Sequence, residues 1–148
     1  VPVAYATGSE DVDALLNGVT ANLDALHKLN DEIPDKQLSD AMDRMEKAGR
    51  SIADTVARTL DKARNVDRFA RYYLPEMVKL MGAYAELEKQ GVKGDNAAQI
   101  EADLRRNADT TAAAFENLLD ALYSAEAMDI STDIEVLDSI LKSQNLTK

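Results

Sequence analysis

The most constraining feature of this 148-residue chain is a run of apolar or small residues that recur at alternating spacings of four and three. A β-strand has a side-chain period of two and cannot keep this pattern, whereas a helix packed along one seam against other helices does. The longest run comprises Leu38, Met42, Met45, Gly49, Ile52, Val56, Thr59, Ala63, Val66, Ala70, Tyr73, Met77, Leu80, Tyr84 and Leu87. Shorter runs comprise Val12, Leu16, Val19, Leu23, Leu26 and Ile33, and Ile130, Ile134, Leu137 and Leu141. The sequence therefore predicts an all-α fold.

Helix start and stop signals divide the first half of the chain. Residues 1–8 are neutral and turn-like, so we expect a flexible tail or linker, followed by a helix that Ser9 caps. Pro34 ends this first helix, because proline lacks an amide hydrogen and pushes the preceding residue out of the helical region. The second helix is expected to run from residue 35 to 73, about 58 Å at 1.5 Å per residue, with a kink or break near Pro75.

Two further boundaries are expected in the second half. The stretch 90–96 contains two glycines and ends in cap-forming residues, which predicts a helical hairpin and a new helix over 96–124. Thr132 and Glu135 have capping-box spacing, so we expect the last helix to begin near Ser131 and to end near Ser143. Residues 9–148 are thus predicted to be a single helical domain, an elongated antiparallel bundle of four to five helices with coiled-coil-like seams.

The charge of the chain excludes one class of partner. The formal net charge is −10, which disfavours binding to a nucleic-acid backbone. Residues 1–40 hold 8 acids and 2 bases, residues 41–79 hold 6 and 9, and residues 80–148 hold 13 and 6. A basic middle between two acidic flanks predicts that oppositely charged helices lie side by side.

No catalytic or metal-binding constellation is evident in the sequence. The absence of cysteine excludes disulfides, zinc-thiolate sites and a cysteine nucleophile, and no hydrolase or phosphate-loop signature is present. Asp129, Ser131 and Asp133 alternate as calcium ligands do, but the loop glycine and the twelfth-position glutamate are missing, which favours helix capping. Asp11 and Asp13 open a helix, and His27 is expected on a helix surface. We expect no cofactor and no metal, and the chemistry argues against an enzyme.

One basic stripe is a candidate binding surface. Arg64, Arg68 and Arg71 recur three and four residues apart beside Tyr72, and such a face can bind an anionic partner or a lipid headgroup. The competing interpretation is a solvated surface, because Asp61 and Asp67 are close enough to neutralise part of the stripe.

The sequence allows both a membrane and a protein as partners. No stretch approaches the roughly 20 apolar residues that a membrane-spanning helix needs. We expect a cytoplasmic protein. The chain begins at Val1 without a methionine, which leaves open an association with the inner face of the membrane through a segment upstream. A protein partner is expected, and the small residues Gly49, Thr59 and Ala63 suit packing within one chain or between two copies.

The second half of the chain resembles a known family, that named for 5-bromo-4-chloroindolyl phosphate hydrolysis, the XpaC-type proteins. The residues that carry the resemblance are Phe69, Tyr72 to Pro75, Lys79, Leu80, Tyr84, Leu87, Gln90, Phe115 to Leu119 and Met128 to Leu137. The resemblance implies a bacterial helical protein, often with hydrophobic segments upstream, and a name taken from an indicator phenotype. It supplies no catalytic residues.

Three functions stay open from these observations. The first is a non-catalytic interaction or scaffold module. The alternative is a phosphatase-like hydrolase acting on indolyl phosphate esters, with a site built from the acidic face and the three arginines. The third is a bundle that binds divalent cations through its acidic last third.

Overall fold

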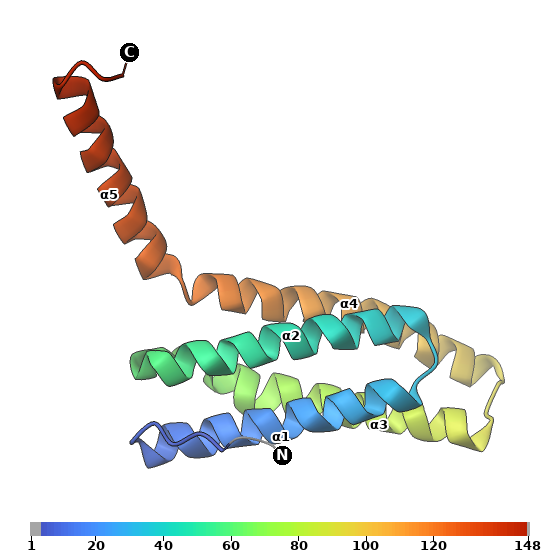
Figure 1. Cartoon of the computed structure of the whole chain (residues 1–148). Coiled ribbons are helices and arrows are strands. Elements are labelled where there is room, and N and C mark those ends of the chain that lie inside the picture. Colours follow the sequence, from blue (N-terminus) through green and yellow to red (C-terminus); the bar gives the residue numbers. More distant parts are fainter. Residues whose placement is uncertain (1–3, 148) are drawn as a thin grey trace.

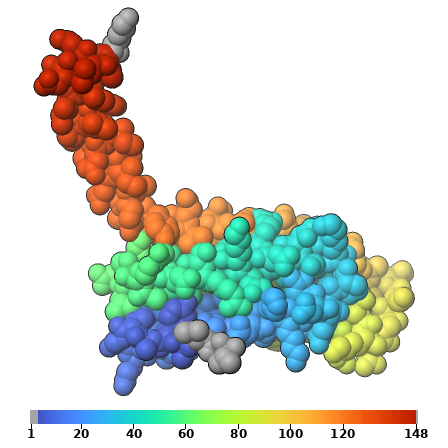
Figure 2. All heavy atoms as spheres, in the orientation of Figure 1, coloured from blue at the N-terminus to red at the C-terminus, as the bar shows by residue number. Residues whose placement is uncertain are grey.

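The computed structural model describes residues 4–147, which form helices and no strand. The predicted all-α fold is confirmed. Four helices, α1 (Glu10–Glu32), α2 (Lys36–Arg58), α3 (Leu74–Gln90) and α4 (Asp95–Ala121), lie side by side with alternating directions (Figure 1). The fifth, α5 (Ser124–Ser143), projects away from one end of this bundle (Figures 1 and 2).

The core lies between the four bundle helices. Its largest fully buried side chains include Leu16, Leu23 and Leu26 from α1, Leu38, Met42, Met45 and Ile52 from α2, Leu74 and Met81 from α3, and Phe69 from the segment before α3. Leu104, Ala108, Ala112 and Phe115 provide the buried face of α4. Burial of these apolar side chains is the main stabilising contribution.

The long second helix expected up to residue 73 is divided earlier, at Thr59, and this prediction is corrected. Thr59 leaves the helical region with φ −138° and ψ 88°, and a 3₁₀ helix over Leu60–Val66 and a π-helix over Phe69–Tyr73 follow. The chain reverses here, so α3 runs antiparallel to α2 (Figure 1). The apolar spacing does not indicate this turn, because residues three apart share a face in a 3₁₀ helix as they do in an α-helix. Near Pro75 the backbone stays helical: the π-helix passes directly into α3 at Leu74, with Tyr73 at φ −64° and ψ −46°, so the expected kink or break is here a change of helix type.

The other helix boundaries follow the expected capping chemistry. The Ser9 and Asp35 side chains accept the amide hydrogens of Val12 and Leu38, at 3.4 and 2.9 Å. Gly91 ends α3 with φ 68°, a left-handed conformation that glycine adopts at little cost. The last helix begins at Ser124 and not near Ser131, so the expected capping box lies inside α5.

The residues just before α1 contact the bundle. The Tyr5 hydroxyl donates to Asp54 at 2.7 Å, and the Thr7 hydroxyl and amide both donate to Asp13. Burial, reinforced by the Asp54 carboxylate, raises the pKa of Tyr5 to about 12. Residues 1–3 of the expected tail lie outside the described part of the chain.

The predicted pairing of oppositely charged helices is confirmed for α2 and α4. Arg44 on α2 lies 2.7 Å from Asp109 and 2.6 Å from Glu116, both on α4. Arg105 of α4 reaches back to Asp35, the N-cap of α2. These pairs place α4, which holds six acids and two bases, against α2, which holds four acids and five bases.

Candidate functional site

A groove lies between α3 and α4. These two helices are joined by a hairpin, yet they contact each other much less than α1 contacts α2 or α2 contacts α4. Two adjoining cavities, of about 420 and 330 Å³, open between them and share Leu80 and Asn107. The two cavities therefore form one groove along the bundle, which we call the α3/α4 groove.

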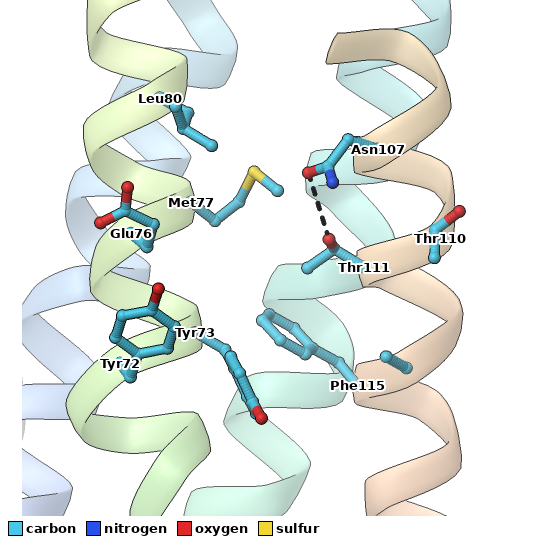
Figure 3. Close-up of a pocket in the computed structure, with 10 residues that line it drawn as sticks. Tyr72, Tyr73, Glu76, Met77, Leu80, Asn107, Thr110, Thr111 and Phe115 are labelled. Atoms are coloured by element: carbon cyan, nitrogen blue, oxygen red, sulfur yellow. Dashed lines mark hydrogen bonds between the residues drawn. The ribbon is translucent and has the colours of Figure 1, made fainter. Parts of the chain in front are cut away.

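The wider cavity of the α3/α4 groove has an apolar floor and a polar rim (Figure 3). Met77 and Phe115 point into it from the two helices, and Thr111 donates a hydrogen bond to Asn107 at 3.5 Å on the α4 side. Among residues 4–147, the charged side chains that line the two cavities are Glu76 and Asp103. Asp103 accepts a hydrogen bond from Arg106 at 2.9 Å. The groove thus suits an apolar ligand surface and not an anion.

The π-helix before α3 shapes one end of the groove. Phe69 points inward and packs edge to face on Phe115, with ring centroids 4.8 Å apart. Tyr72 and Tyr73 are turned outward and line the groove, with Tyr72 62% exposed. Tyr73 was expected in the buried seam, and this is corrected. The wider π turn shifts the residues that follow Phe69, and such turns are frequent at functional sites.

The structure separates the four residues of the predicted basic surface. Arg64 and Arg71 line a cavity of about 170 Å³ with Asp11 and Asp67, and Arg71 Nε donates to Asp67 at 2.6 Å. Tyr72 lines the α3/α4 groove instead. The fourth residue, Arg68, is exposed and lines neither of these two cavities.

Helix α5 carries an apolar face with no neighbour among the described residues, and none of its residues is buried. The seam Ile130, Ile134, Leu137 and Leu141 was expected to pack against other helices, and among the described residues it does not. The first three are each more than half exposed, as are Met128, Val136 and Ile140. Exposed apolar surface of this extent is typical of an interaction site.

Lys62 holds the junction between α4 and α5. Its side chain is only 12% exposed, and its ammonium group lies 2.7 Å from the Glu126 carboxylate and 4.6 Å from the centre of the Tyr123 ring. It also donates to the Leu122 carbonyl, one of the carbonyls left unpaired at the end of α4. The Tyr123 hydroxyl contacts Thr55 on α2 at 3.0 Å. The direction of α5 is therefore set by the bundle.

The remaining candidate residues lie on helix surfaces. His27 is exposed, as expected, and its Nδ1 lies 2.8 Å from Glu46 on α2; this hydrogen bond raises the pKa of His27 above its usual value. Asp129 and Asp133 lie on exposed α5. Among residues 4–147, no group of three or more histidine, cysteine or acidic side chains is placed to hold a metal ion. In the same range, no helix has the length and apolar character needed to cross a membrane.

Comparison with known proteins identifies the family. A search of curated proteins and a search of solved structures gave no match. The family model described as "5-bromo-4-chloroindolyl phosphate hydrolysis protein" matches residues 8–137, which include the whole four-helix bundle and most of α5. The resemblance seen in the second half therefore extends over nearly all of the chain, and the chain belongs to the family of 5-bromo-4-chloroindolyl phosphate hydrolysis proteins.

Proposed function

We propose that this chain is a non-catalytic helical module that binds protein partners through α5. The observation that carries the proposal is the apolar seam Ile130, Ile134 and Leu137, which stands in solvent on a helix that the bundle holds in a fixed direction. The contacts of Lys62 with Glu126 and with the Leu122 carbonyl support an outward direction for α5. Leaving such a face in water is unfavourable, so the face is expected to be covered when a partner is present.

The rival function is the hydrolase that the family description names. A phosphate ester requires cationic or metal groups that face the phosphate, because the charge that develops in the transition state must be stabilised. The α3/α4 groove has the volume for a small ligand, but its charged lining residues are the carboxylates Glu76 and Asp103. The cavity beside Arg64 and Arg71 is smaller than typical ligand pockets and already holds two aspartates.

Hydrolysis by the purified chain separates the two functions. We expect no release of indolyl product from 5-bromo-4-chloroindolyl phosphate, with or without magnesium, above that of a buffer control. The matched variant is Arg64→Ala with Arg68→Ala and Arg71→Ala, which removes the cations of the predicted basic surface. Turnover by the wild-type chain that this variant abolishes would overturn the proposal and assign an active site to that surface.

A second experiment tests the binding face directly. A photoreactive amino acid is placed at Ile134, on the apolar face of α5, and in a separate chain at Ser139, on the opposite face of the same helix. We expect cross-links to protein from position 134 and few from position 139 in the cells that encode the chain. Equal cross-linking from both positions would mean that the apolar face is not a specific binding surface.

A further inference from the structure

Two tyrosine rings and one carboxylate line the wider cavity of the α3/α4 groove. The rings of Tyr72 and Tyr73 are steeply inclined to each other, with an interplanar angle of 68° and centroids 5.5 Å apart. Glu76, three residues after Tyr73, lines the same cavity (Figure 3). Inclined aromatic rings attract alkylated ammonium groups to their faces, and a carboxylate beside them adds an opposite charge. This end of the groove therefore suits an organic cation.

No cation of the described residues neutralises Glu76. Its side chain is partly buried, and among residues 4–147 no lysine, arginine or histidine nitrogen lies within 4.0 Å of its carboxylate. The other carboxylate of the groove differs, because Arg106 pairs with Asp103 at 2.9 Å. Partial withdrawal of a carboxylate from water is unfavourable unless an opposite charge replaces the water. Glu76 is thus the carboxylate that a cation from outside can pair with.

An apolar channel leads away from the tyrosine pair. The second cavity shares Leu80 with the first, and most of the side chains that line it are apolar or aromatic: Leu80, Ala83, Tyr84, Leu87, Ile100 and Leu104. Along α4 the groove extends from Phe115 to Ile100, about 22 Å. Both cavities, of about 420 and 330 Å³, have the size of small-molecule sites. The groove therefore has room for an alkyl chain that starts at the tyrosine pair.

We propose that the α3/α4 groove binds a single-chain cationic amphiphile. Its alkylated ammonium group lies against Tyr72, Tyr73 and Glu76, and its alkyl chain follows the channel past Leu80. A fatty-acid anion would bring negative charge against Glu76, and a phosphocholine lipid would bring its phosphate there, so both are disfavoured. The site is separate from the apolar face of α5, so this inference goes beyond the proposed function and does not depend on it.

Calorimetric titration with decyltrimethylammonium below its micelle concentration tests the site. We expect saturable binding of one molecule per chain. Decanoate, which has a similar alkyl chain and the opposite charge, should bind at least about 10-fold more weakly. Decylphosphocholine, which carries a phosphate beside its ammonium group, should also bind more weakly. Each methylene added to the cation should raise the affinity up to about 4-fold while the channel has room for it, so dodecyltrimethylammonium should bind more tightly.

Variants of the tyrosine pair and of Glu76 locate the site. Tyr72→Ala combined with Glu76→Gln removes one ring and the charge, and should weaken binding of decyltrimethylammonium about 10-fold or more. Tyr72 is largely exposed and Glu76 is outside the core, so the helical circular dichroism should not change. The control for the overall charge of the chain is Asp120→Asn, an exposed position on the face of α4 opposite the groove, which should bind as the wild type does.

The acidic and apolar helix α5 is the competing site for such an amphiphile. Ile134→Ser with Leu137→Ser should leave the binding unchanged. The inference is overturned if this α5 variant loses binding while the Tyr72 and Glu76 variant keeps it, if decanoate binds as tightly as the cation, or if no saturable binding occurs. Any of these results leaves the proposed function standing, because cross-linking from position 134 tests that function separately.

Discussion

Lys62 and Glu126, 64 residues apart in the chain, form an ion pair of 2.7 Å between the turn that follows α2 and the first turn of α5. This pair joins the bundle to the helix that leaves it. Hydrogen bonding from Lys62 lowers the pKa of Glu126, so the carboxylate stays charged. The partly buried Lys62 is thus one of the contacts that orient the exposed helix, together with that of Tyr123 and Thr55.

Replacement of Lys62 by methionine should free the direction of α5 while the bundle stays folded. Methionine fills similar space but cannot donate to Glu126 or to the Leu122 carbonyl. Spin labels on Lys47→Cys and Ser139→Cys should give a broader distance distribution in the Lys62→Met chain, measured among excess unlabelled chain. Lys142→Met, which changes a lysine at the far end of α5, is the control. An unchanged distribution would show that other contacts direct α5.

Gly49 should tolerate no side chain, whereas Gly82 should accept one. A Cβ atom at Gly49 would lie 2.6 Å from a methyl carbon of Leu23, which is buried between α1 and α2. Gly49→Val should therefore lower the free energy of unfolding by about 1–3 kcal/mol. A Cβ at Gly82 meets nothing within 4 Å, so Gly82→Ala should raise it by about 0.5–1 kcal/mol. Urea denaturation measures both, and a Gly49 variant as stable as the wild type would contradict this packing.

The sequence allowed the helices and most of the core to be predicted, because their apolar residues follow the helical period. It failed at Thr59, where no proline or glycine marks the end of α2 and the spacing of Val56, Thr59, Ala63 and Val66 continues through the turn. Only the tertiary structure distinguishes such a turn from a continuous helix.

Most of the candidate site could not be predicted from the sequence. The seam of Ile130, Ile134 and Leu137 predicts an amphipathic helix, but the period does not say whether the apolar face is covered by the same chain. The groove is formed by Leu80, Asn107 and their neighbours, whose exposure results from the loose contact between α3 and α4. One signal was available in the sequence. The last predicted helix is acidic, and the basic segment of residues 41–79 is already paired with the acidic helix before it, so the last helix was left without a basic partner.

The contact between His27 and Glu46 should make stability depend on pH in one direction. The hydrogen bond to Glu46 raises the pKa of His27, with a smaller contribution from Asp31 and opposition from Arg50. A raised folded-state pKa means that the stabilisation is complete below the unfolded value near 6.5 and is lost as pH rises through the folded-state value. His27→Gln should thus destabilise the chain at about pH 5.5 and have little effect at about pH 8.5. Because His27 is the only histidine, its NMR titration gives the pKa directly, and a value at or below 6.5 would contradict the contact.

Asp35 should contribute to stability in two separable ways, as the cap of α2 and as the partner of Arg105. Its carboxylate accepts the Leu38 amide hydrogen at 2.9 Å and pairs with Arg105 from α4. Asp35→Ala removes both contacts and should cost about 1–2 kcal/mol, whereas Asp35→Asn keeps the cap and should cost less.

The pH dependence of these variants checks the second contribution. The hydrogen bond from Arg105 holds the pKa of Asp35 below its usual value, so its stabilisation is present at neutral pH and is lost as pH falls through the lowered value. The difference in stability between the wild type and Asp35→Asn should therefore shrink in acid, and Arg105→Gln should reproduce that behaviour with the cap intact. If urea denaturation shows Asp35→Asn and Asp35→Ala to be equally unstable at neutral pH, the cap contributes nothing and the ion pair with Arg105 accounts for the whole effect.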